Sequence, residues 1–229
     1  MLAAVLAALV LLSQPLQRVD VALDPGHSRA DVGAVGSGLR EYQLTLDLAN
    51  RVRSRLEGAQ LHVRLTREDD LPLTAYTNPN STEQIQAEQE ARIAAGGPAR
   101  IYVSLHFNGG PTSLRGTETY FNPDRGPEAS SADRALADLL QQHVVSALAN
   151  DIGYSSVDRG VKSDLAAGKS YGHFFGLRGP VPSALVENLF LSNANEAAML
   201  RDDATLDALA DGCAQGIFEY LAGEGGVAD

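Results

Sequence analysis

Three side chains that could bind a metal ion or carry a proton each follow a short apolar run of this chain. His27 ends an Asp-Pro-Gly-His turn after the first run, His106 directly follows a later one, and Glu187 closes another. Short apolar runs bounded by turn residues are typical of buried strands, and in parallel sheets ligands bind at the carboxyl ends of strands. The sequence therefore predicts that these side chains share one rim of a sheet.

Glu41 is a fourth candidate, because it opens a predicted helix that would begin near the same rim. Two histidines and one glutamate form a hydrolytic zinc set, which leaves a fourth position for water. Zinc lowers the pKa of that water to about 7, and a further carboxylate is needed to carry protons, which makes Glu187 the candidate base. A histidine at a strand end is more often a hydrogen-bonded loop residue, so spacing alone leaves both interpretations open.

Strand-like and helix-like segments alternate along the chain. Strands are predicted at 19–23, 61–65, 101–105, 117–121, 171–177 and 183–187. Helices are predicted at 41–56, 82–95 and 132–150, followed by two closing helices through Met199 and Ile217. This alternation predicts a single α/β domain, in which a mainly parallel, twisted sheet of about six strands has helices on both faces.

The first predicted helix is amphipathic, with one apolar face formed by Leu44, Leu48, Val52 and Leu56. Cys213 lies in a similar pattern near the C-terminus and is expected to be a buried apolar side chain. Because it is the only cysteine, an intramolecular disulfide and a zinc site of several thiolates are both excluded.

Composition and charge exclude some partners. The chain has 229 residues, of which 44% are hydrophobic, which is enough for one sizeable core. Its formal net charge is −11. Nucleic acids and anionic lipid surfaces require clustered Lys and Arg, so we expect no nucleic-acid partner.

Residues 1–12 form an apolar run with the length of a signal-peptide core, which is short for a membrane span. No basic residue precedes the run, and residues 13–17 contain no Ala-x-Ala cleavage site. A signal peptide, a short membrane anchor and an N-terminal core helix all remain open. We favour export, and this segment is also the candidate for membrane contact.

A series of motifs follows in a characteristic order: LDPGHSRADVGA (23–34), GLREY (38–42), LTREDD (65–70), VSLHFN (103–108), GTETY (116–120), RGVK (159–162) and LVENLFLSN (185–193). In these motifs the chain resembles the zinc N-acetylmuramoyl-L-alanine amidases of the third amidase type, which include autolysins, cell-division amidases and spore-cortex enzymes. One motif alone would be weak evidence, whereas the ordered set is highly specific.

The resemblance implies an active zinc hydrolase that cleaves the amide bond between N-acetylmuramic acid and L-alanine in peptidoglycan. His27, Glu41 and His106 match the family's zinc ligands, and Glu187 matches its catalytic glutamate. In this mechanism Glu187 takes a proton from water and returns it to the leaving amine.

The expected domain organisation is an apolar N-terminal segment, 1–17, and a zinc amidase catalytic domain, 18–224. We expect a monomer with peptidoglycan as its partner. Its expected location is outside the cytoplasm, as a secreted, periplasmic or cell-wall-associated protein.

The chain departs from the family pattern near the predicted metal site. Ser28-Arg29 stand where Gly-Gly usually follows the first histidine, and Asn188-Leu189 stand where Gly-Phe usually follows the glutamate. The usual Arg-x-x-x-Ala-Asn run is reduced to ARIAAGG at 91–97. Only a short Gly-rich connection separates the RGVK and LVEN motifs, which leaves no room for the helix that blocks the metal in some division amidases. We therefore expect an enzyme that is not autoinhibited.

Arg178 and Asn108 are the candidate substrate-binding residues. Arg178 follows a predicted strand end and can bind a stem-peptide carboxylate through two parallel hydrogen bonds, although a surface ion pair is an equal alternative. Asn108 can also orient the loop after His106, and Asp24 can orient His27.

The remaining histidines, His62, His143 and His173, receive no role in the zinc site. Two other functions would use the same residues. A zinc peptidase would apply them to a peptide bond of the stem, and an inactive wall-binding or regulatory domain would keep the fold without turnover. The products of a digest distinguish the three.

Overall fold

A six-stranded sheet forms the centre of the protein, in a computed structural model that describes residues 19–225. In spatial order its strands are β4 (Val63–Leu65), β1 (Val19–Pro25), β5 (Ala99–Asn108), β8 (Ser183–Phe190), β6 (Thr117–Phe121) and β7 (Asp158–Ser163). All neighbouring strands are parallel except β6 and β8, which are antiparallel. The predicted mainly parallel sheet is therefore confirmed.

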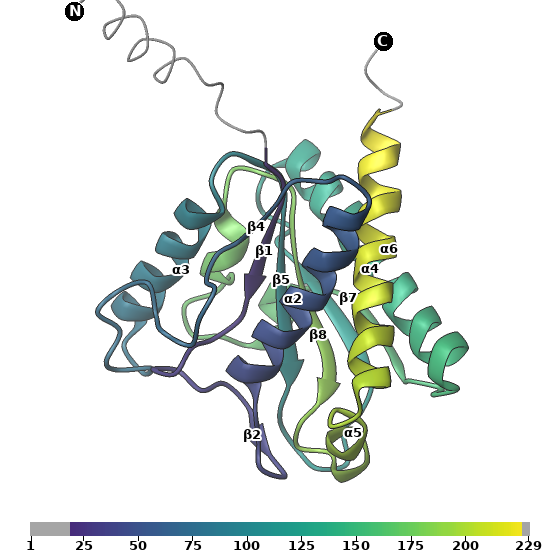
Figure 1. Cartoon of the computed structure of the whole chain (residues 1–229). Helices are drawn as coiled ribbons and strands as arrows, with labels where there is room; N and C mark the ends of the chain where they lie inside the picture. Colours follow the sequence, from purple (N-terminus) through teal and green to yellow (C-terminus); the bar gives the residue numbers. More distant parts are fainter. Residues whose placement is uncertain (1–18, 226–229) are drawn as a thin grey trace, which may run out of the picture.

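Helices cover both faces of this sheet, as predicted (Figure 1). One face carries α2 (Glu41–Gly58), α4 (Pro127–Ile152) and α6 (Asp203–Gly225), with the short α5 (Ala194–Met199) at one end. The other face carries α3 (Thr82–Gly96). The carboxyl ends of β1, β5 and β8 point to the same end of the molecule, which is where the predicted site residues lie.

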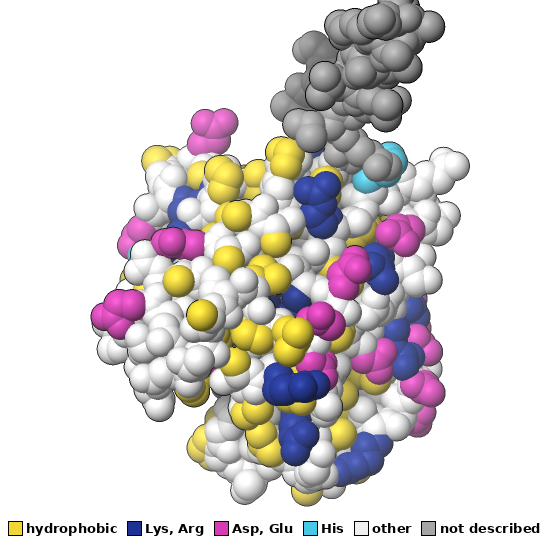
Figure 2. All heavy atoms as spheres, turned by 60° about the vertical axis from the view of Figure 1, so that its left-hand side comes forward, with side chains coloured by type: hydrophobic (Ala, Val, Ile, Leu, Met, Phe, Trp, Pro, Cys, Tyr) yellow, Lys and Arg dark blue, Asp and Glu magenta, His cyan; other side chains and the backbone are white. Residues whose placement is uncertain are grey.

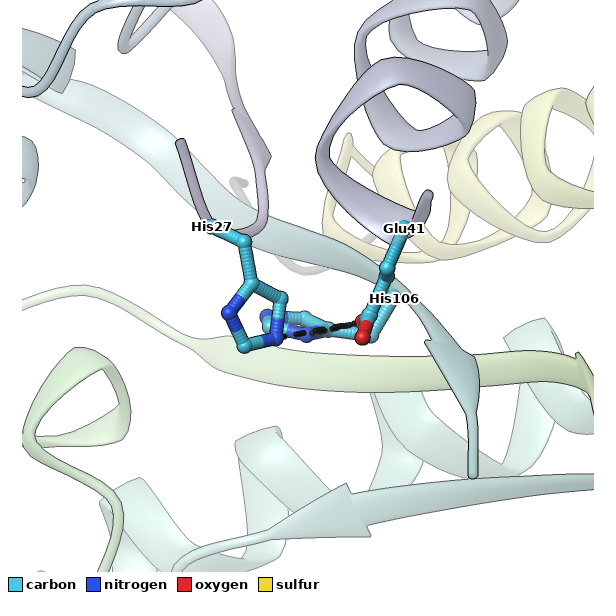
Figure 3. Close-up of side chains that lie close together, drawn as sticks. All are labelled: His27, Glu41 and His106. Atoms are coloured by element: carbon cyan, nitrogen blue, oxygen red, sulfur yellow. Dashed lines mark hydrogen bonds and ion pairs between the residues drawn. The ribbon is translucent and has the colours of Figure 1, made fainter. Parts of the chain in front are cut away.

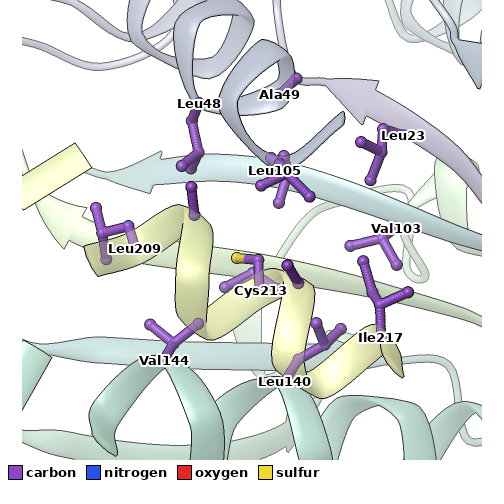
Figure 4. Close-up of a cluster of buried hydrophobic side chains, with 14 of the residues drawn as sticks. Leu23, Leu48, Ala49, Val103, Leu105, Leu140, Val144, Leu209, Cys213 and Ile217 are labelled. Atoms are coloured by element: carbon purple, nitrogen blue, oxygen red, sulfur yellow. The ribbon is translucent and has the colours of Figure 1, made fainter. Parts of the chain in front are cut away.

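The main core lies between the sheet and the three long helices (Figure 4). Leu48 of α2, Leu140 of α4 and Ile217 of α6 are fully buried there, and each contributes about 1.5–3 kcal/mol of apolar burial. Cys213 is buried in the same layer, as predicted, and this burial raises the pKa of its thiol to about 12. Cys213 is therefore an unreactive core residue.

A smaller amount of apolar packing covers the opposite face. Val19, Ala22 and Tyr102 pack there against Ile93 of α3. Farther along the sheet, Tyr120, Leu177 and Leu185 pack against Phe174. This face is therefore covered partly by a helix and partly by a connecting segment, and the cavity described below lies between the two.

Ion pairs join α2 to α6 on the surface. Arg51 of α2 lies 2.9 Å from Asp47 of the same helix, and 2.5 and 3.0 Å from Asp203 and Asp207 of α6. On the face shown in Figure 2, the basic side chains are separated by acidic and apolar ones. Acidic and basic side chains are thus interspersed on that face.

The prediction of a strand at 171–177 was wrong. The segment is a loop that leads into a short 3-10 helix, η2 (Phe175–Arg178), because both edges of β8 are already paired with β5 and β6. Its aromatic residues pack instead, and the rings of Tyr171 and Phe175 stack with centroids 4.7 Å apart. Arg178 consequently ends a 3-10 helix and not a strand.

The remaining strand of the sheet is β7, which includes the RGVK motif and to which the sequence analysis assigned no strand. Its residues, DRGVKS, include few with a high strand propensity. It is a half-exposed edge strand on β6, where Arg159 and Lys162 both donate hydrogen bonds to the buried Glu118. The polar strand β7 is therefore held on β6 by ion pairs of its side chains as well as by backbone hydrogen bonds.

One helix boundary and one small element also differ from the predictions. Helix α4 begins at Pro127 and not at residue 132, because proline suits the first position of a helix. A short hairpin of β2 (Val35–Gly36) and β3 (Leu39–Arg40), which was not predicted, leads into α2.

No helix within residues 19–225 is long and apolar enough to cross a membrane. The apolar run at the N-terminus, and the predicted boundary after residue 17, lie outside the described residues.

Candidate active site

His27 is held in an uncommon backbone conformation just after β1. Its φ is 62°, in the left-handed region that few residues other than glycine adopt. The ring Nδ1 donates to Asp31 Oδ2 at 2.9 Å, which leaves Nε2 to face Glu41. A side chain at the preceding Gly26 would place its Cβ 2.3 Å from the His106 ring, so only glycine fits between the two histidines.

His27, Glu41 and His106 come together from three separate elements (Figure 3). His27 follows β1, Glu41 opens α2, and His106 lies near the end of β5. Glu41 Oε1 lies 3.2 Å from His27 Nε2 and 3.0 Å from His106 Nδ1. One donor atom from each of the three residues lies within 4.8 Å of the others. The structure thus brings together the three residues that the sequence analysis named as candidate ligands.

The charges of these three groups depend on one another. Burial opposes protonation of His27, but the Glu41 carboxylate and the hydrogen bond to Asp31 raise the pKa of His27 to about 10. Burial acts against the charged form of Glu41 too, yet the two histidines hold the pKa of Glu41 well below its usual range. Burial also lowers the pKa of His106, helped by the nearby His27. The cluster thus holds an anionic carboxylate and a positive charge that a metal cation would replace.

The donor set fits a zinc ion. Ligand atoms about 2.1 Å from a tetrahedral zinc lie roughly 3.4 Å from one another, which is close to the separations around Glu41 Oε1. Glu41 is oriented by two backbone amides, since Ala34 N donates to Oε2 at 2.6 Å and Phe107 N to Oε1 at 3.1 Å. A Cβ at Gly33 would lie 2.4 Å from Glu41 Oε2, so the loop closes tightly around this carboxylate. Such supporting contacts are typical of metal ligands.

Glu187 lies beside the cluster but is not part of it. In the sheet it is directly opposite His106 of β5 and Glu118 of β6, so the three side chains emerge on the same face. Its Oε2 is buried and has no hydrogen-bond partner among the described residues. Burial, followed by the charges of Glu41 and Glu118, raises the pKa of Glu187 well above its usual value. An unpaired carboxylate that holds a proton readily is suited to acid–base chemistry.

The two histidines of the cluster and Glu187 line a cavity of about 240 Å³ on the α3 side of the sheet. Its polar lining includes His27, His106 and Glu187, together with Asp31 and Lys169. The apolar lining is supplied by Pro79, Ile85, Leu185, Tyr171, Phe174 and Phe175. The sequence analysis did not predict this apolar wall, because the segment that contributes half of its residues, 171–177, was predicted to be a strand.

Two buried arginines hold the loop that carries His27. Arg92 of α3 donates to Pro25 O at 2.7 Å and to His27 O at 2.6 Å, and it pairs with Asp24 at 3.0 Å. Arg67 donates to Pro25 O at 2.9 Å and to Gly26 O at 3.0 Å. Asp24 therefore acts on His27 through Arg92.

Neither arginine was assigned a role from the sequence. Arg92 is 1% exposed and also pairs with Glu88, which in turn accepts hydrogen bonds from the backbone of Leu73 and Thr74. The only signal in the sequence was that Arg92 and Arg67 lie within segments that resemble the amidase family. Asp31, the partner of His27, was missed in the same way.

Asn108 lies at the end of β5, and its Nδ2 donates to Glu118 Oε1 at 2.8 Å. It does not line the cavity. His62 is a largely exposed side chain, and His143 contacts Glu219, as expected for histidines outside the site. His173 bonds Asp164 at 2.7 Å, so it anchors the cavity wall.

Arg178 lies outside the cavity lining as well. Its guanidinium donates to Tyr171 O at 3.1 Å and to His173 O at 2.7 Å, and it lies 4.2 Å from the centre of the Phe175 ring. Because these contacts already occupy it, we expect Arg178→Ala to raise KM for a muramoyl-peptide by less than about threefold. Steady-state kinetics test this expectation, and a rise of more than tenfold would restore Arg178 as a carboxylate-binding residue.

The sequence matches a known family over most of its length. The family model of the N-acetylmuramoyl-L-alanine amidases matches residues 21–219. The chain belongs to this amidase family. The protein YqiI of Bacillus subtilis (strain 168) is 32% identical to this amidase, over 96% of this chain and 93% of that protein.

Named amidases are similar as well. The N-acetylmuramoyl-L-alanine amidase LytC of Bacillus subtilis (strain 168) is 30% identical over 91% of this chain, which spans only 37% of LytC. The catalytic domain of CwlV, an N-acetylmuramoyl-L-alanine amidase from Bacillus (Paenibacillus) polymyxa var. colistinus, superposes with a TM-score of 0.70 at 31% identity. That alignment covers 89% of this chain and 98% of the CwlV domain. The resemblance of sequence motifs is therefore confirmed for both family and fold.

Proposed function

We propose that this amidase hydrolyses the amide between N-acetylmuramic acid and L-alanine with a zinc ion held by His27, Glu41 and His106, and with Glu187 as its proton carrier. The observation that carries the proposal is the placement of Glu187. Glu187 lines the same cavity as the two histidines and stands apart from the three-residue cluster, and its Oε2 has no hydrogen-bond partner among the described residues. The site thus separates the groups that would bind a cation from the group that would move a proton.

When bound, zinc supplies a Lewis acid that polarises the substrate carbonyl and lowers the pKa of water. Glu187 takes the proton of the attacking water and delivers it to the amine of L-alanine as the C–N bond breaks. Asp31 keeps the His27 ring in position through Nδ1, and Arg92 and Arg67 hold the backbone of that loop. The partly buried cavity limits the access of bulk water to Glu187.

A digest of purified peptidoglycan tests this function. We expect stem peptides that begin with L-alanine and intact sugar chains, both identified by mass spectrometry. A chelator should reduce release to background, and added zinc should restore it. His106→Ala should bind much less zinc, whereas His62→Ala, at an exposed histidine outside the cluster, should behave as the wild type.

Other products would assign another function. Fragments cut within the stem would make the protein a zinc peptidase. Bound zinc without any cleavage would make it a wall-binding or regulatory domain.

The location and assembly of the amidase are also part of the proposal. Its substrate lies outside the cytoplasm, so we place the protein there, as a monomer that reaches peptidoglycan in secreted, periplasmic or wall-associated form. Membrane contact, if present, would come from the N-terminal apolar segment. Fractionation and the measured mass in solution test these two points.

A further inference from the structure

Lys169 is an unpaired cation at the edge of the active-site cavity. It lines the cavity together with His27, His106 and Glu187. Among residues 19–225 its side chain has no hydrogen-bond or ion-pair partner. Its positive charge nevertheless acts on the site, because it favours the ionised form of Glu187 and so acts to lower the pKa of that carboxyl.

The other basic groups around the site are already occupied. Arg159 and Lys162 share the carboxylate of Glu118. Arg178 donates to two backbone carbonyls, and Arg92 is buried between two carboxylates. Among the described residues that line the cavity, Lys169 is therefore the one lysine or arginine that a ligand can reach.

The position of Lys169 is defined by the structure of its loop. Gly172 N donates to Lys169 O at 3.0 Å, which closes a turn. The turn is held on one side by the 3-10 helix η1 (Asp164–Ala167) and on the other by the hydrogen bond between His173 and Asp164. The exposed ammonium is thus presented from an anchored turn.

The chemistry of the substrate indicates what this cation would meet. N-acetylated sugars carry no charge, and the lactyl carboxyl of muramic acid is bound in the scissile amide. The negative charges lie on the stem peptide. Where the residue after L-alanine is linked onward through its side-chain carboxyl, its α-carboxylate stays free and is the first of these charges. Since the whole protein has a net charge of −11, such a carboxylate needs a local positive group to be bound.

We propose that Lys169 is a specificity-determining residue that binds the carboxylate of the second stem-peptide residue. The inference rests on the proposed function, because it assumes that a muramoyl-peptide occupies this cavity. The proposal also sets the orientation of the substrate in the cavity. The stem peptide lies along the wall formed by Lys169, Tyr171 and Phe174, and the sugar lies on the opposite side of the metal ligands. The amidase then prefers stems whose second residue has a free carboxylate over stems in which that group is amidated.

The test compares two synthetic muramoyl-dipeptides that differ only in that group, one with the free carboxylate and one with the primary amide. We expect Lys169→Ala to raise KM for the acid substrate about five- to tenfold, as for a charge-assisted hydrogen bond, and to leave KM for the amide substrate unchanged. Any change in kcat that follows from the altered environment of Glu187 should be the same for both substrates. Lys169→Arg should retain the preference, and Lys169→Glu should reverse it. The preference of the wild type should weaken at high salt, because the ion pair is partly exposed.

Arg134→Ala is the matched control, since it removes one positive charge from an exposed position on α4. It should leave both substrates unaffected. Equal losses on the acid and amide substrates in Lys169→Ala, or no change on either, would overturn the role of Lys169 while leaving the amidase assignment intact. A wild-type enzyme that cleaves neither substrate would overturn the proposed function, and the inference with it.

Discussion

Glu187→Gln is expected to lower kcat by about 10²- to 10⁴-fold, the range for loss of a general acid–base group. Glutamine preserves the size of the side chain but cannot take a proton from water. Glu187 is not one of the three clustered donors, so the zinc content should stay at the wild-type level. Turnover of a muramoyl-peptide and metal analysis of the same sample measure the two effects.

Glu118→Gln provides a matched control. Glu118 lies directly opposite Glu187 in the sheet, but its carboxylate is paired with Arg159 and Lys162. This variant should lose some stability and keep kcat within about tenfold of the wild type, because Glu118 moves no proton. If Glu187→Gln kept more than about a tenth of wild-type kcat, another group would have to be the base.

Arg92→Met is expected to reduce the free energy of unfolding by about 3–5 kcal/mol, as when one partner of a buried ion pair is removed. Asp24 and Glu88, which are 1% and 2% exposed, would lose their buried cation. The carbonyl oxygens of Pro25 and His27 would lose a donor, so the His27 loop should loosen and zinc affinity should fall. Urea unfolding and a zinc titration of the folded protein test the two consequences separately.

Arg51→Met is the control for this prediction. Arg51 also pairs with three carboxylates, but on the surface between α2 and α6. Exposed ion pairs contribute about 0–1 kcal/mol each, so this variant should be only slightly destabilised and should bind zinc normally. Equal losses of unfolding free energy in the two variants would show that the burial of Arg92 does not make its ion pairs contribute more to stability than those of Arg51. Unchanged zinc affinity in a folded Arg92→Met protein would show that Arg92 does not position His27.

Local patterns in the sequence marked the residues of the proposed chemistry as candidates, and the resemblance to the amidase family gave them their expected roles. His27, His106 and Glu187 each stand at the end of a short apolar run, and parallel strands bring such ends to one rim. The register then places Glu187 opposite His106. Glu41 followed from its place at the start of an amphipathic helix, whose apolar face is buried as predicted.

The error at 171–177 has a physical cause. Aromatic and glycine residues in this segment resemble those of a strand, but strand pairing depends on which edges of a sheet are free. Both edges of β8 are occupied, and the edge of β6 is taken by the more polar β7. Local sequence contains no information about that competition, so the aromatic residues form a cavity wall instead.

By itself, the sequence determined the fold class, the main helices and the set of residues that could bind a metal or carry a proton. The tertiary structure decided which groups support them. Arg92 and Asp31 act on His27 through contacts that exist only after α3 and the loop have packed against β1. The tertiary structure also decided that the Arg178 guanidinium donates hydrogen bonds to backbone carbonyls, whereas Lys169 lines the cavity without a partner among the described residues. The physical reason is that strand ends and helix faces are set by neighbours in sequence, whereas the pairing of a charge is set by whatever the folded chain brings within a few ångströms.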